Sequence, residues 1–167
     1  MTNMHVVNTS KIFGKKILMD TNLLLVYLIG LYDVELIEKH KRTKGKYYKE
    51  DFVLIDNILK RYSKIITTPH ILTEISNLAA QIDETTKMKL FSLFSIKFML
   101  LEEIFEPFIE IVGNYEFEKY GLTDSAFCSL AIKNDFVVLT DDFKFSGQLE
   151  KKHVETININ HLRKHIY

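Results

Sequence analysis

Five acidic residues stand at positions where their carboxylates could be brought together: Asp20, Glu74, Asp124, Asp141 and Asp142. Carboxylate oxygens are the ligands that hard divalent cations such as Mg²⁺ and Mn²⁺ prefer. Such a cation lowers the pKa of a bound water, and a second cation roughly 3.5–4 Å away can stabilise the leaving oxygen of a phosphodiester. The residue types therefore indicate metal-assisted hydrolysis as the chemistry available to this chain.

Three of these acids directly follow predicted strands. The short apolar run Ile17–Met19 predicts a buried strand, and Asp20 comes immediately after it. The segment Phe136–Thr140 predicts the strongest strand of the chain, and Asp141 and Asp142 follow it. Because sites in open parallel α/β sheets form beyond the carboxyl ends of the strands, we expect these acids at one edge of the sheet.

The other two acids belong to predicted helices. Thr68-Pro69 predicts a helix start after a strand at 65–67, and Glu74 lies in its second turn. Thr123 predicts the cap of another helix, with Asp124 in the first turn. At 100° per residue, Asp124 falls on the apolar face and Glu74 at the border of the apolar stripe. A buried acid is costly unless it is paired or binds a metal, which favours a cation site.

Each acid taken singly also has a purely structural interpretation. Asp20 could cap the following helix, and Asp141-Asp142 could form a turn before one. Asp124 could match the dipole of its helix, and Glu74 could be a solvated surface acid. The shared location of all of them at one sheet edge favours the site interpretation.

Two polar neighbours are expected to support the acids. Thr140 could hydrogen-bond a ligand or a phosphate, and Asn22 could do the same beside Asp20. The sequence leaves open whether Asp141 or Asp142 is the fourth acidic ligand.

The remaining periodicity predicts alternating strands and helices. Helices are expected at 23–31, 51–62, 68–82, 87–101, 108–120, 123–134 and 146–151, a last strand at 154–159, and a closing turn of helix at 161–165. Thr21-Asn22 is the expected cap of the first helix. Alternation of this kind favours an α/β layer fold with a parallel sheet.

Length and composition agree with one domain over residues 1–167, containing an extended helical and basic-loop segment at 33–64. Net charge is zero, with 22 basic and 22 acidic residues, which argues against a uniformly basic nucleic-acid binder. Residues 39–49 nevertheless hold five Lys and one Arg with no acid. This stretch could grip an RNA backbone with Tyr47 and Tyr48 stacking on bases, or be a plain solvated loop.

Other features carry less functional weight. The single cysteine, Cys128, excludes an internal disulfide, predicts a small buried residue and fits a reducing cytoplasm. Apolar runs are shorter than the roughly 20 residues of a membrane span, so no membrane partner is expected. The stripe of Phe91, Phe94 and Phe98 predicts core, with a partner surface as the alternative. His161 and His165 lack an evident third metal ligand.

Four stretches resemble the motifs of the PIN-domain family, in the family's order between about residues 16 and 160. They are Lys16–Leu25 (KILMDTNLLL), Thr68–Ile75 (TPHILTEI), Leu122–Phe127 (LTDSAF) and Phe136–Asp142 (FVVLTDD). The resemblance implies a Rossmann-like three-layer fold with a central parallel sheet of four to five strands flanked by helices. It also implies an endoribonuclease with one or two Mg²⁺ or Mn²⁺ ions on Asp20, Glu74, Asp124 and Asp142, with Asp141 sharing or replacing the last role.

The family includes toxins of bacterial toxin–antitoxin pairs and RNA-processing nucleases. The resemblance therefore implies an RNA substrate, with an antitoxin protein or a second copy of the chain as further partners. The 33–64 segment is longer than the compact toxin form needs. Alternatives are a catalytically weak PIN-like RNA- or protein-binding module and a nuclease acting on structured DNA. A receiver domain would need an acidic pair after the first strand, and a nucleotide-binding Rossmann fold would need a Gly-rich loop.

Overall fold

The computed structural model describes residues 14–113 and 115–163, and within them a single parallel sheet organises the chain. Its strands run in the order β3-β2-β1-β4-β5. They are β1 (Lys16–Met19), β2 (Lys64–Thr67), β3 (Glu102–Glu103), β4 (Val137–Thr140) and β5 (Thr156–Asn158). The predicted α/β class with a parallel sheet is therefore confirmed.

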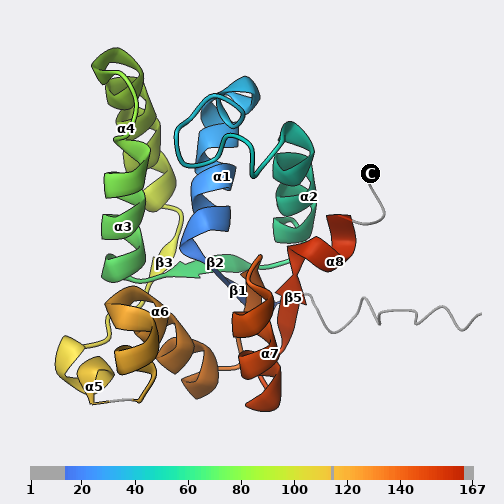
Figure 1. Cartoon of the computed structure of the whole chain (residues 1–167), viewed down its shortest axis with the longest axis vertical. Helices are drawn as coiled ribbons and strands as arrows, with labels where there is room; N and C mark the ends of the chain where they lie inside the picture. The colour runs from blue at the N-terminus through green and yellow to red at the C-terminus, as the bar shows by residue number, and fades with distance from the viewer. Residues whose placement is uncertain (1–13, 114, 164–167) are drawn as a thin grey trace, which may run out of the picture.

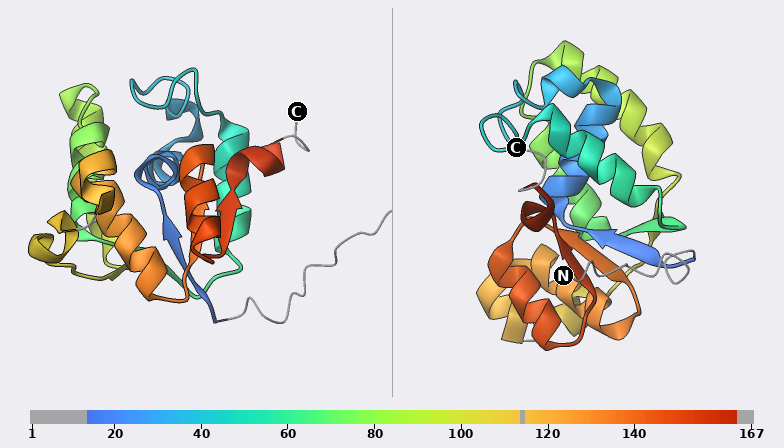
Figure 2. Two further views of the ribbon diagram at one scale, coloured as in Figure 1. Left: turned by 60° about the horizontal axis from the view of Figure 1, so that its bottom comes forward. Right: turned by 90° about the vertical axis from the view of Figure 1, so that its right-hand side faces the viewer.

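Helices cover both faces of the sheet. The helices α1 (Thr21–Tyr32), α2 (Lys49–Leu59), α3 (Pro69–Ala79) and α4 (Glu84–Phe98) lie on one face. The helices α5 (Phe108–Val112), α6 (Tyr115–Lys133) and α7 (Phe143–Lys151) lie on the other, as Figures 1 and 2 show. A short α8 (Ile159–Arg163) follows β5 near α2. Because β1 is central and covered on both faces, Ile17, Leu18 and Met19 are fully buried.

The strand register brings the ends of β1 and β4 together. Leu18 pairs with Ile66 on one side and with Val138 on the other, and Met19 pairs with Leu139. The backbone N–H of Asp20 then donates to the Leu139 carbonyl at 3.0 Å. The first residue after β1 therefore lies directly beside the end of β4, as predicted for a site at the carboxyl edge of the sheet.

Several element boundaries differ from the prediction. Asp20, rather than Thr21-Asn22, is the N-cap of α1. Asp142 is the N-cap of α7, which starts at Phe143, three residues earlier than expected. The strand β3 was not predicted, because two residues leave no periodic signal. The predicted helices at 108–120 and 123–134 become α5 and a long α6 that is broken at Gly121, where φ is 78°. Thr123 therefore lies within the second part of α6.

The 33–64 segment is anchored in the core rather than solvated throughout. After a 3-10 turn at Val34–Leu36, the side chains of His40, Thr43 and Tyr47 are buried. The Thr43 hydroxyl donates to the Ile37 carbonyl at 2.6 Å, which closes the turn locally. The cations between these anchors remain exposed. The Lys and Arg side chains are therefore solvated, as the plain-loop interpretation expects, while His40, Thr43 and Tyr47 anchor the segment.

Two lesser predictions concern the interior. Phe94 is buried, with its ring stacked between those of Phe91 and Phe98, so the stripe on α4 is largely core, although Phe91 stays 37% exposed. Cys128 is buried, as expected. No helix within the described ranges is long and apolar enough to cross a membrane.

Candidate functional site

A pocket of about 670 Å³ opens beside the carboxyl ends of β1 and β4. Every residue singled out for the site lines it: Asp20, Asn22, Glu74, Asp124, Thr140, Asp141 and Asp142. The acids reach it from the N-cap of α1, from α3, from α6 and from the turn between β4 and α7. The fold thus assembles residues that are up to 122 positions apart in the chain.

Asp20 is held firmly by the backbone around it. One carboxylate oxygen, Oδ1, accepts from the Leu23 N–H at 2.8 Å and caps α1. The other, Oδ2, accepts from the Thr140 hydroxyl at 2.6 Å and from the Asp141 N–H at 3.0 Å. Burial, and then the negative charge of Asp141, raise the pKa of Asp20 to about 6. The capping role and the site role therefore coexist in one carboxylate.

Asp124 faces the pocket together with two other acids. Partial desolvation, followed by the charges of Glu74 and Asp142, raises the pKa of Asp124. Phe127, Cys128 and Ala131, which share the predicted apolar face with it, are buried. The Asp124 side chain is nevertheless accessible to solvent, so the expected burial of this acid is wrong. Asp124 lies shortly after the break at Gly121, in the second part of α6, and lines the pocket.

Glu74 and Asp142 are positioned by their own helices. Glu74 is half-buried on α3 and accepts from the Thr21 hydroxyl at 3.3 Å. Asp142 is exposed and caps α7, since its Oδ1 accepts from the N–H groups of Lys144 at 2.7 Å and Phe145 at 3.0 Å. Both Glu74 and Asp142 line the pocket.

Asp141 takes part in a different set of contacts. Its Oδ2 accepts from the Tyr47 hydroxyl at 2.5 Å and lies 3.2 Å from Lys46 Nζ. The expectation that Tyr47 stacks on bases is therefore wrong, because its ring is 1% exposed. With Asp141 engaged by the 33–64 segment, the geometry favours Asp142 as the partner of Asp124 and Glu74.

A second layer of contacts supports the Asp141 turn. Asn160 Nδ2 donates to the backbone carbonyl of Asp141 at 2.6 Å, and the side-chain Oδ1 of Asn160 accepts from Arg163 at 2.7 Å. Arg163 also pairs with the buried Asp51 of α2 at 2.7 Å. Sequence reasoning missed these residues, because nothing in the local pattern around Asn160 or Arg163 indicates a contact with α2.

The donor set fits a hard divalent cation in its chemistry. The facing groups are carboxylates, and the charges of neighbouring acids help to raise the pKa of Asp20 and of Asp124, an effect that a bound cation would oppose. Among residues 14–113 and 115–163, however, no three His, Cys, Asp or Glu side chains form a ready-made cluster of metal ligands. Mg²⁺ commonly keeps several waters and binds through one or two carboxylates, so an open arrangement still suits it.

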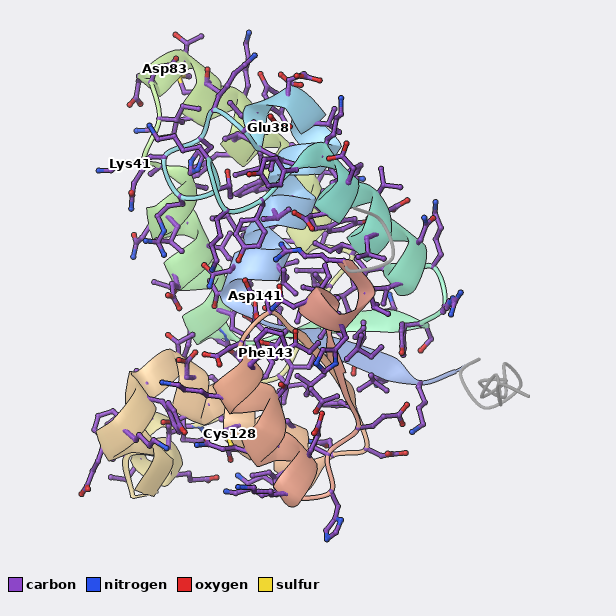
Figure 3. All side chains as sticks on the ribbon, turned by 45° about the vertical axis from the view of Figure 1, so that its right-hand side comes forward. Glu38, Lys41, Asp83, Cys128, Asp141 and Phe143 are labelled. Carbon is purple, nitrogen blue, oxygen red and sulfur yellow. The ribbon has the colours of Figure 1, made fainter. Side chains whose placement is uncertain are left out.

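Cations also line the pocket and were only partly foreseen. Arg42 and Lys46 belong to the predicted basic stretch, whereas Lys119 of α6 and Lys144 of α7 do not. The exposed ring of Phe143 lines the pocket as well. His161 lies against Phe143, with ring centroids 5.3 Å apart, and its proposed partner His165 lies outside the described residues. Figure 3 shows Asp141 and Phe143 between the helices of the two faces.

Comparison with known proteins supports the fold. No family model and no curated protein matches the chain. A crystal structure of VapBC2 from Rickettsia felis, bound to a DNA fragment from their promoter, superposes with a TM-score of 0.50 and 17% sequence identity. The match covers 86% of this chain and 98% of that one. At this identity the likeness concerns the fold alone, which is consistent with the PIN-like architecture.

Proposed function

We propose that this chain is a metal-dependent endoribonuclease that hydrolyses RNA phosphodiester bonds, with Asp20, Glu74, Asp124 and Asp142 as its catalytic metal ligands. The observation that carries the proposal is the convergence of these acids, from four separate elements, on one pocket at the carboxyl edge of the sheet. RNA as the substrate comes from the resemblance of the four motifs to PIN domains.

The roles of the residues follow from their contacts. One or two Mg²⁺ or Mn²⁺ ions on the four acids would supply a water of lowered pKa and charge neutralisation at the phosphate. Thr140 and the Asp141 N–H orient Asp20 through its Oδ2, so this carboxylate needs no reorganisation. Asn22, at the pocket wall, is suited to hydrogen-bond the phosphate. Asp141 holds the 33–64 segment against the site.

Membership of a toxin–antitoxin pair is the biological setting that we propose. The solved VapBC2 structure is a two-component assembly, and its likeness over 86% of this chain supports a toxin with an antitoxin protein as partner. A cytoplasmic RNA target would accompany that role. The 33–64 segment, which is longer than compact toxins need, is where such a protein would differ from its relatives.

A PIN-like binding module is the second candidate. One observation favours it: within the described ranges, no three acids form a ready-made metal cluster. Such a module would bind RNA or protein without hydrolysis, and structured DNA would be the alternative substrate of an active form.

An RNA cleavage assay with Mn²⁺ decides between the candidates. Asp124→Asn should lower the cleavage rate by at least about a hundredfold, because the variant loses a carboxylate that would hold the metal, and the metal would stabilise the charge at the phosphate. Asp135→Asn makes the same chemical change at a side chain that is 88% exposed and outside the pocket, so it should cleave like the parent protein. Undiminished cleavage by Asp124→Asn, or cleavage in excess EDTA, would contradict the metal mechanism.

A further inference from the structure

Phe143 is a large apolar side chain that the core does not use. Its ring is 54% exposed, whereas Phe145, two residues later, is 8% exposed and packs on Phe127 with ring centroids 5.3 Å apart. Phe145 therefore supplies the packing that attaches the start of α7. Phe143, at the same helix start, is outside the hydrophobic core and the residues packed against it, so its ring is available at the surface.

The position of Phe143 is set by the site itself. Asp142 caps α7 and Phe143 is the first residue of that helix, so the backbone that orients the acid also orients the ring. His161 lies against the ring with centroids 5.3 Å apart and supports it. Both Asp142 and Phe143 line the pocket, which places a flat apolar surface beside the carboxylates.

Charges around the ring suit an anionic chain. Four cationic side chains line the described pocket: Arg42, Lys46, Lys119 and Lys144. Five carboxylates face them, so a single divalent cation leaves this lining net positive. Phosphates are attracted to such a surface, while the aromatic face is suited to the one flat, apolar part of a nucleotide, its base.

We propose that Phe143 is the stacking platform for an unpaired base next to the phosphate that the acids bind. This inference rests on the proposed function, since it assumes that RNA enters this pocket. A base inside a duplex has both faces covered by its neighbours, so a ring that lines the pocket can stack on an unpaired base but not on a base in the interior of a duplex. Phe143 thereby favours single-stranded RNA, loops and unpaired ends over RNA duplexes.

Fluorescence anisotropy tests the platform without requiring cleavage. A labelled oligoadenylate RNA is titrated with protein in a buffer that contains Ca²⁺. The same strand annealed to oligouridylate serves as the duplex probe. A denaturing gel checks that the probe keeps its full length. Phe143→Ala should weaken single-strand binding about tenfold and leave duplex binding unchanged. Phe143→Tyr keeps a ring and should bind like the parent. Phe108→Ala, at a 63% exposed ring on α5 outside the pocket, is the matched control.

The outcomes separate this inference from the proposed function. Four results would each overturn the platform. Phe143→Ala could bind single strands like the parent, or Phe108→Ala could lose as much affinity. Phe143→Ala could lose as much affinity for the duplex, or the parent protein could fail to bind single strands. A selective loss in Phe143→Ala, in a protein that never cleaves RNA with Mn²⁺, would retain the platform and reject the ribonuclease. Circular-dichroism melting curves of each variant, compared with that of the parent protein, check that the variants are folded.

Discussion

The Tyr47 hydroxyl donates a hydrogen bond of 2.5 Å to Oδ2 of Asp141, across 94 positions of sequence. Tyr47 belongs to the basic stretch of the 33–64 segment, and Asp141 directly follows β4. Lys46 lies 3.2 Å from the same oxygen, and Arg163 lies over the Tyr47 ring at 5.3 Å. This contact joins the cationic segment to the strand end on which the site is built.

Tyr47→Phe should lower the free energy of unfolding by about 1–3 kcal/mol, because a carboxylate of low exposure loses its shortest donor. Urea unfolding followed by circular dichroism measures the change. Tyr32→Phe, at a half-buried tyrosine at the end of α1, controls for the loss of a hydroxyl as such. Equal stability of Tyr47→Phe and the parent protein would show that Lys46 alone holds Asp141.

Gly30→Ala should destabilise the protein by about 1–3 kcal/mol, the usual cost of overpacking. A Cβ at this position would lie 2.3 Å from Cδ2 and 2.6 Å from Cγ of Phe52, so the ring would have to leave its stack on Tyr27. Gly147→Ala on α7 is the matched control, since a Cβ there meets nothing within 4 Å. That control should be neutral or stabilising by up to about 1 kcal/mol, because Ala favours helix. A Gly30→Ala melting temperature at or above that of Gly147→Ala would be inconsistent with this packing.

The titration of Asp20 should contribute to the pH dependence of the free energy of unfolding. Its pKa is raised from an ordinary value near 3.8 to about 6, so the folded state holds the proton more tightly than the unfolded chain. Its contribution to stability is therefore fully present below pH 3.8 and is lost as pH rises through about 6. Without divalent cations, the stability of the parent protein relative to Asp20→Asn should fall by about 2.4 kcal/mol between pH 4 and 7. A difference that stays constant or increases with pH would disprove the raised pKa.

Divalent cations should stabilise the folded chain independently of any catalysis. Mn²⁺ or Mg²⁺ at about a hundred times its Kd should add about 2.7 kcal/mol, because the ion binds the folded acids and relieves their repulsion. Differential scanning calorimetry at constant ionic strength measures the shift in Tm. Asp124→Asn should lose most of the shift and Asp135→Asn should keep it. An identical shift in both variants would place the ion elsewhere.

Much of the candidate site could be predicted from local sequence. An apolar run that ends in Asp20, and another that ends before Asp141, show strand ends without reference to any other part of the chain. Thr68 caps α3 as predicted, with its hydroxyl accepting from the Ile71 N–H at 3.2 Å, and this fixed the place of Glu74. These signals are readable because a strand end or a helix cap is decided by a few neighbouring residues.

Local sequence failed where the deciding contact is distant or the element is short. Tyr47 looked like an exposed base-stacking residue, and only its packing near β4 shows it buried on Asp141. Asp124 looked buried by helical angle, and only the tertiary structure shows that it is exposed and lines the pocket.

The sequence by itself therefore determined the α/β alternation and the acids that end its elements, because backbone preferences and periodicity are local. Only the tertiary structure added Lys119 and Lys144 to the pocket. It also separated Asp141, bound to the 33–64 segment, from Asp142, whose charge acts on Asp124. It also exposed Phe143 while burying Phe145. Contacts between residues some ninety positions apart depend on how the layers pack, and that packing leaves no pattern in the neighbouring residues.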